Sequence, residues 1–94
     1  MKVMLIDGQE APYGYRVPCG FLLAAVDENG APMYRPDTTW AIQSDWDFPA
    51  LAANFGYAWG WDNHDNATEA ISAAYDFLAA HAGEVADVEV EAIA

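Results

Sequence analysis

The sequence predicts an α+β fold, a small antiparallel sheet packed against one long and one short helix. Short apolar runs separated by glycine and proline fill residues 1–43 and are typical of strands and turns. Residues 45–82 instead carry apolar side chains at helical spacing, interrupted by glycines. The chain has 94 residues, of which 54% are hydrophobic, so we expect residues 1–94 to form a single domain with one modest core.

The strands are expected mainly in the first half of the chain. Val3–Ile6 is a short apolar run, and residues 21–26 form a second one. Asn29-Gly30 follows and predicts a hairpin turn with a return strand over residues 33–35, because both turn residues tolerate positive φ. Residues 38–43 are rich in β-branched and aromatic side chains and predict a further extended segment.

Residues 8–20 are expected to form a loop, because glycines and prolines recur along them, with a short extended piece around residues 15–17. The only cysteine, Cys19, lies in this loop, so no intrachain disulfide is expected. No histidine is near it in the sequence, and we interpret Cys19 as a small, partly buried apolar residue rather than a nucleophile.

The second half of the chain carries clear helix signals. Asp47 as N-cap, a proline in the first turn and Gly56 as a stop predict a short helix. Asn66, with a glutamate three residues later, predicts the start of a longer helix that runs to about residue 82 and ends at Gly83. The expected apolar stripe of this longer helix is Ala67, Ala70, Ile71, Ala74, Tyr75 and Leu78.

Acidic residues alternate with valines from Asp87 to Glu91, which predicts a last strand. Alternate residues of a strand point to the same side and lie about 6.7 Å apart. Asp87, Glu89 and Glu91 are therefore expected to form a row of carboxylates along one face of that strand.

Negative charge is concentrated in the second half of the chain. The net charge is −12, from 15 acidic and 3 basic residues. Residues 1–44 contribute −2, whereas residues 45–94 hold ten acids and no lysine or arginine. We therefore expect no direct binding to nucleic acid or to anionic membranes, which are polyanions themselves. Such a charge favours a basic partner, a bound cation, or simply solubility.

Rows of carboxylates a few ångströms apart resemble the phosphates of DNA, so they predict binding to a groove lined with lysine and arginine. Trp59 and Trp61 lie beside some of these acids and are either exposed anchors or core residues, whereas Trp46 and Phe55 are expected in the core. The predicted partner-binding residues are Asp45, Asp47, Trp59, Trp61, Asp62, Asp65, Glu69, Asp76, Glu84, Asp87, Glu89 and Glu91.

A metal site is the main chemical alternative, with Asp62, His64 and Asp65 as candidate ligands. These residues lack the spacing of a calcium-binding EF-hand and of zinc hydrolases, and a polar loop that caps the next helix explains them equally well. The sequence also lacks a glycine-rich phosphate loop. We expect neither a cofactor nor an enzymatic activity.

In its size, its net charge and carboxylate rows such as Asp87, Glu89 and Glu91, the chain resembles small acidic proteins of phages and mobile elements, including DNA mimics and anti-CRISPR inhibitors. The resemblance is one of composition and transfers no residue role. It implies an inhibitor that occupies the basic channel of a CRISPR surveillance complex and prevents the binding of target DNA.

Two other functions stay open. One is an accessory or structural protein of a phage or a haloadapted host, whose charge serves solubility. The other is a small metal-binding domain at the residues named above. The apolar run at residues 3–6 is too short for a signal peptide, and no run approaches the ~20 residues of a membrane span, so a location in the cytoplasm of a bacterial host is expected.

Overall fold

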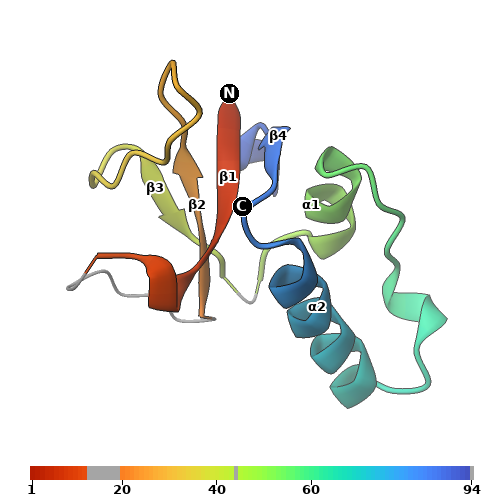
Figure 1. Ribbon diagram of the computed structural model, residues 1–94. Helices are drawn as coiled ribbons and strands as arrows, with labels where there is room; N and C mark the ends of the chain where they lie inside the picture. Colours follow the sequence, from red (N-terminus) through yellow and green to blue (C-terminus); the bar gives the residue numbers. More distant parts are fainter. Residues whose placement is uncertain (13–19, 44, 94) are drawn as a thin grey trace.

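In a computed structural model, which describes residues 1–12, 20–43 and 45–93, an antiparallel sheet lies beside a layer of helices (Figure 1). The strands are β1 (Lys2–Asp7), β2 (Phe21–Ala25), β3 (Thr39–Ala41) and β4 (Val85–Asp87), in the spatial order β3-β2-β1-β4. The helices are α1 (Phe48–Asn54), α2 (Ala67–His81) and the short α3 (Val90–Ile93), with 3-10 turns η1 (Gly8–Glu10) and η2 (Trp61–Asn63). The predicted α+β class is confirmed. The extended piece expected at residues 15–17 lies outside the described residues, as does Cys19.

The central strand pair β1–β2 is apolar on both faces because both of its faces are covered. Its register pairs Val3 with Ala25 and Leu5 with Leu23. On the helix side, these strands contribute to a core of Val3, Leu5, Phe21, Leu23, Ile42, Trp46, Phe48, Leu51, Ala74, Leu78, Val88 and Ile93. On the other side a smaller cluster of Ile6, Leu22 and Ala24 is packed by Met4, Ala11 and Tyr34. A strand buried on both faces needs a continuous apolar run, which explains why residues 21–25 are all buried.

The expected hairpin turn exists, but the return strand over residues 33–35 is wrong. The turn spans Asp27 to Gly30, and Gly30 has φ +79° whereas no described non-glycine residue has positive φ. After the turn, Val26 and Pro32 form only an isolated bridge, and β2 pairs with β3 instead. Proline cannot donate a ladder hydrogen bond, and Pro32 and Pro36 enclose the segment that was expected to be a strand.

Both main helices begin and end as predicted. The Asp47 carboxylate accepts a hydrogen bond from the Ala50 amide at 3.2 Å, and the Asn66 side chain accepts one from the Glu69 amide at 2.9 Å. Gly56 and Gly83 follow α1 and α2 with φ of +84° and +95°, a conformation that glycine adopts without steric cost.

The strand predicted from Asp87 to Glu91 is wrong beyond its first residue. β4 ends at Asp87, and the chain then turns into α3, where the Ala92 amide donates to the Glu89 carbonyl at 3.0 Å. This change of direction lets both Val88 and Ile93 enter the helix-side core, in which they are at most 1% exposed. Burial of these two side chains therefore overrides the local alternation of acid and valine.

Leu78 tests the packing of α2 against the sheet, because its side chain is completely buried in the helix-side core. We expect Leu78→Ala to lower the free energy of unfolding by about 2–5 kcal/mol, through lost apolar burial and the cavity left behind. Ile71→Ala, on the same helix at a side chain that is 50% exposed, should lower it by less than about 1 kcal/mol. Urea denaturation measures both, and equal losses would contradict this packing.

Candidate functional site

The twelve predicted partner-binding residues do not form one continuous patch. They are distributed over the start of α1, the segment from residue 57 to the first turn of α2, the outer side of α2, and the C-terminal residues 84–91. Among them only Trp59 and Glu84 are half-buried, and the others are exposed. Most of the candidate contacts are therefore accessible to a partner. They differ in whether their side chains already make contacts within the fold.

Four of the carboxylates are already engaged within the fold. Asp47 caps α1, and Glu69 accepts a hydrogen bond from the Asp65 amide at 3.4 Å. Glu84 and Asp87 make the contacts described below. In the part of the chain that the structure describes, no side-chain hydrogen bond or ion pair is made by the remaining six, which are Asp45, Asp62, Asp65, Asp76, Glu89 and Glu91.

The predicted row of carboxylates on a C-terminal strand is not formed. Asp87 lies in β4, whereas Glu89 and Glu91 lie beyond it, in the turn that leads into α3 and in α3 itself. The α-amino group of Met1 donates a hydrogen bond to the Asp87 carboxylate at 2.6 Å, and this contact lowers the pKa of Asp87 below its ordinary value. Lys2 is the cross-strand partner of Asp87. Positive charge therefore offsets part of the negative charge at this end of the sheet.

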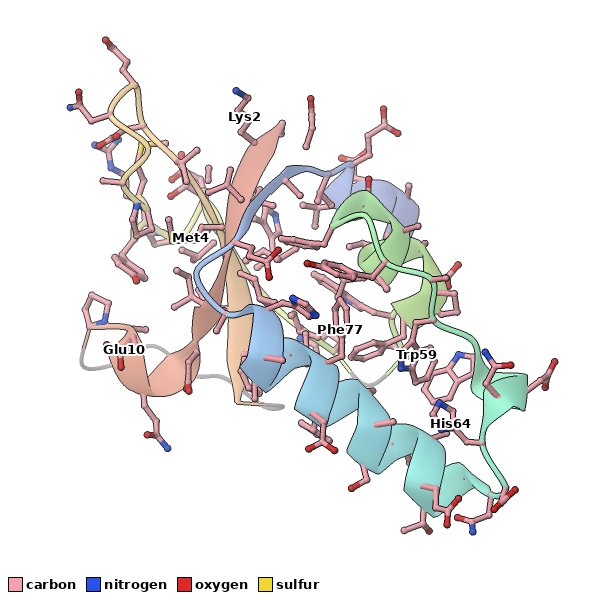
Figure 2. The ribbon with its side chains drawn as sticks, turned by 45° about the vertical axis from the view of Figure 1, so that its right-hand side comes forward. Lys2, Met4, Glu10, Trp59, His64 and Phe77 are labelled. Carbon is pink, nitrogen blue, oxygen red and sulfur yellow. The ribbon has the colours of Figure 1, made fainter. Side chains whose placement is uncertain are left out.

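An aromatic cluster marks the other end of the molecule. Trp59 lies 4.5 Å from Trp61 and 5.7 Å from Phe48, measured between ring centroids, and it also packs against His64 at 5.3 Å. Figure 2 shows Trp59 and His64 side by side in the segment that precedes α2. Trp59 is half-buried against the core, whereas 43% of Trp61 is exposed. Of the two alternatives left open by the sequence, Trp59 is closer to a core residue and Trp61 to an exposed one.

The core predictions for the other two aromatic residues have different outcomes. Trp46 is 7% exposed and belongs to the core, as expected. Phe55 is half-buried and packs against the core from its edge.

An apolar pocket of about 200 Å³ lies between this aromatic cluster and α2. We call it the α2 groove, and it is lined by Phe48, Trp61, Ala67, Ile71, Ala74, Tyr75 and Leu78. Ile71 is 50% exposed and Tyr75 is 41% exposed, although the sequence pattern places both on the apolar stripe of the helix.

The groove exists because α2 carries two apolar rows at a spacing of four residues. The row Ala70, Ala74 and Leu78 is buried against the sheet, being at most 3% exposed. The adjacent row, Ala67, Ile71 and Tyr75, is exposed. Sequence reasoning missed this site because it merged the two rows into one core-facing stripe. The stripe has the ordinary spacing of a core-facing helix surface, so the sequence alone did not indicate that one of its rows would stay exposed.

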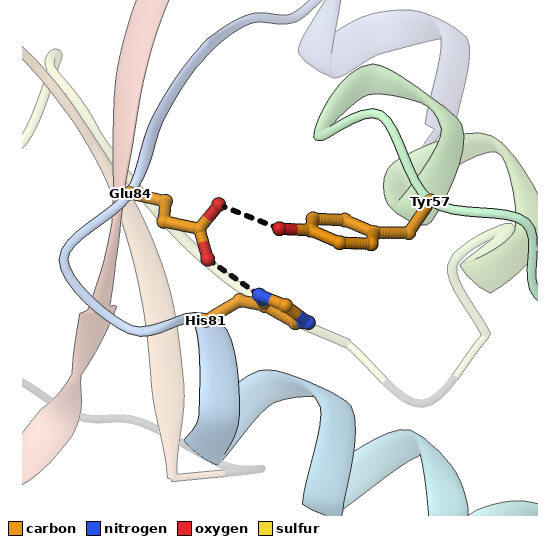
Figure 3. A network of polar contacts seen from close by, with 3 residues as sticks. All are labelled: Tyr57, His81 and Glu84. Carbon is orange, nitrogen blue, oxygen red and sulfur yellow. Dashed lines mark hydrogen bonds and ion pairs between the residues drawn. The ribbon is translucent and has the colours of Figure 1, made fainter.

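Glu84 takes part in a polar network that ties the end of α2 to the segment after α1 (Figure 3). Its carboxylate forms a hydrogen bond with Nδ1 of His81 and accepts one from the Tyr57 hydroxyl at 3.3 Å. The Tyr57 and His81 rings stack with centroids 4.0 Å apart, and Phe77 packs against both. Partial burial and the negative charge of Glu84 raise the pKa of Tyr57. The Glu84 carboxylate is therefore already engaged in contacts within the fold.

The candidate metal ligands are not assembled into a site. Among the described residues, no group of three or more His, Cys, Asp or Glu side chains is placed to hold a metal ion. His64 packs its ring against Trp59, and the Asp65 amide donates to Glu69, so the loop caps α2 and supports the aromatic cluster.

Comparisons with protein-family profiles, with curated proteins and with solved structures found no match for this chain. Within the described ranges, no helix has the length and apolar character needed to cross a membrane.

Asp47 and Asp45 are exposed aspartates two positions apart, and only Asp47 caps a helix. Substitution of each in turn therefore compares a capping carboxylate with a surface carboxylate that has no side-chain partner among the described residues. We expect Asp47→Ala to lower the free energy of unfolding by about 1 kcal/mol, because the Ala50 amide loses its capping acceptor. Asp45→Ala should change it by no more than about 0.5 kcal/mol. Chemical denaturation distinguishes the two, and an equal effect of both substitutions would argue against the cap.

The Tyr57 network predicts a measurable titration. We expect Glu84→Gln to lower the pKa of Tyr57 toward its ordinary value, because the negative charge that opposes phenolate formation is removed. Ultraviolet absorbance of the phenolate follows the titration, and subtraction of the Tyr57→Phe curve isolates this tyrosine. Because the fold holds this proton more tightly than the unfolded chain does, the associated stability is lost at alkaline pH. An unchanged Tyr57 titration in Glu84→Gln would refute the contact.

Proposed function

We propose that this chain is a non-enzymatic acidic binding protein that blocks a basic nucleic-acid-binding surface. The most specific form of the proposal is an anti-CRISPR-type inhibitor that acts in the cytoplasm of a bacterial host and prevents a surveillance complex from binding its target DNA. Exposed charge of one sign is the main support. Residues 45–94 hold ten acids and no lysine or arginine, and six of these carboxylates have no side-chain partner among the described residues.

The size and charge of the molecule are compatible with partial mimicry of DNA. Its longest dimension is 40 Å, slightly more than one turn of duplex, which is about 34–36 Å. A duplex as long as this 40 Å dimension carries about 23 charges at one per ~1.7 Å. That is about twice the net charge of −12 found here. The protein would therefore replace part of a DNA footprint, at the positions where its acids are most concentrated.

The region around η2 and α2 is the favoured contact surface. Asp62, Asp65, Glu69 and Asp76 are all exposed there. The described bases, Lys2 and Arg35, belong to the first half of the chain, and Figure 2 shows Lys2 at the opposite end of the molecule from Trp59 and His64. A basic partner would meet three carboxylates there, Asp62, Asp65 and Asp76, that have no side-chain partner among the described residues.

A competition assay tests the proposal. The protein is titrated into complexes of DNA with a panel of CRISPR surveillance complexes and unrelated basic DNA-binding proteins, at about 50 mM and about 200 mM salt. We expect DNA to be displaced from one complex selectively and less effectively at the higher salt. Reversal of Asp62 and Asp65 to lysine should weaken displacement about tenfold or more, because a close interfacial charge pair contributes about 1.5 kcal/mol or more.

Two further double variants complete the design. Glu89→Lys with Glu91→Lys tests the C-terminal acids, for which a smaller effect is expected because Met1 and Lys2 already offset charge there. Glu28→Lys with Asp37→Lys makes the same change of net charge at exposed positions in the first half and serves as the control. Equal losses in all three variants would indicate nonspecific polyanion behaviour. No displacement from any complex would favour a role of the charge in solubility.

A further inference from the structure

The α2 groove gathers an unusual share of the exposed apolar surface. Six large hydrophobic side chains are exposed among the described residues, and three of them, Trp61, Ile71 and Tyr75, line this one pocket. Isolated exposed hydrophobic residues are normal on a protein surface, whereas a contiguous group around a concave site marks an interaction surface. Exposed apolar area lowers solubility, so the need for solubility does not explain why these three side chains are exposed together.

The dimensions of the groove fit side chains of a partner protein rather than a cofactor. Its volume of about 200 Å³ is below the roughly 300–1,000 Å³ of typical small-molecule sites. The exposed row from Ala67 to Tyr75 extends about 12 Å along α2, at 1.5 Å per residue. Two apolar side chains one helical turn apart, which are separated by about 5–6 Å, fit within that length.

The charges next to the groove indicate the character of its occupant. Three of its lining residues are adjacent in sequence to exposed aspartates, namely Phe48 to Asp47, Trp61 to Asp62 and Tyr75 to Asp76. A second copy of this chain would bring another acidic half against this one, and like charges brought together are unfavourable. A segment whose apolar residues are flanked by lysine or arginine places apolar side chains in the pocket and positive charges next to the aspartates.

We propose that the α2 groove binds an amphipathic basic helix of a partner protein. Apolar side chains at i and i+4 of that helix enter the groove beside Ile71, Tyr75 and Trp61, while its lysines and arginines contact the neighbouring carboxylates. This inference rests on the proposed function, because the helix belongs to the same basic partner. It adds an apolar anchor to a contact that charge alone would leave nonspecific.

Two synthetic peptides test the groove directly. One is a helical peptide of about four turns, with leucines one turn apart on one face and lysines on the flanks. The other has the same composition with leucines and lysines permuted, so that no apolar face forms. Calorimetry on the full chain measures affinity, and backbone amide shifts locate the site. We expect the patterned peptide to bind about tenfold more tightly or better, with shifts along residues 67–75.

Protein variants assign this preference to the groove. Ile71→Ser should remove the tenfold preference for the patterned peptide and leave its salt dependence unchanged, because no charge is altered. Val85→Ser is the matched control, since Val85 is 46% exposed on β4 and does not line the groove. Thermal melts of both variants verify that they fold.

Three results would overturn the inference. They are equal binding of the two lysine peptides, an undiminished preference in Ile71→Ser, and binding of neither peptide. A patterned peptide with glutamate in place of lysine should not bind, and its binding would likewise overturn the inference, because the acids would then not select a basic partner. Because the DNA competition assay is independent, displacement of DNA without a preference between the peptides would reject the groove and retain the proposed function. Preference for the patterned peptide without displacement of DNA would retain the groove and reject the proposed function.

Discussion

Burial of β1 and β2 between two layers organises the rest of the domain, because a strand covered on both faces can be stabilised only by partners on both sides. The helices supply one layer, and the other includes Ala11, which directly follows η1, and Tyr34 in the loop after β2. The sheet that results is short, since β3 and β4 have three residues each. It has enough area to bury one row of α2, and the second row is left exposed. This exposed row, together with Phe48 and Trp61, lines the α2 groove.

Self-repulsion among the acids of residues 45–94 opposes the compact state, and the fold compensates for only part of it. Asp47 and Glu69 lie in or next to the first turns of α1 and α2, where the helix dipole and free amides favour negative charge. Glu84 has His81 as a hydrogen-bonding partner, and Asp87 has the Met1 amino group. Of the acids next to the groove, Asp62 and Asp76 have no such partner among the described residues. A basic partner would relieve this repulsion on binding, which is one reason why its contacts should concentrate there.

Signals that act over three or four residues could be interpreted correctly from the sequence, whereas those that depend on tertiary contacts could not. The caps at Asp47 and Asn66 and the glycines that end both helices are local, and all were predicted. The alternation from Asp87 to Glu91 is also local, but burial of Val88 and Ile93 takes precedence over it. The exposure of Trp61 and Ile71 depends on which row of α2 meets the sheet, and no sequence window contains that information.

The same distinction explains why charge alone defined the candidate site so loosely. Twelve positions were selected because they are acidic or aromatic, and the fold spreads them over both ends of the helical half. Carboxylates act over the ~8 Å screening length of physiological salt, so their positions restrict a partner only weakly. An apolar pocket acts at contact distance and therefore fixes the register of whatever it binds. If a basic partner binds as proposed, specific recognition depends on the few uncharged residues of the α2 groove, and the carboxylates set the association rate and its dependence on salt.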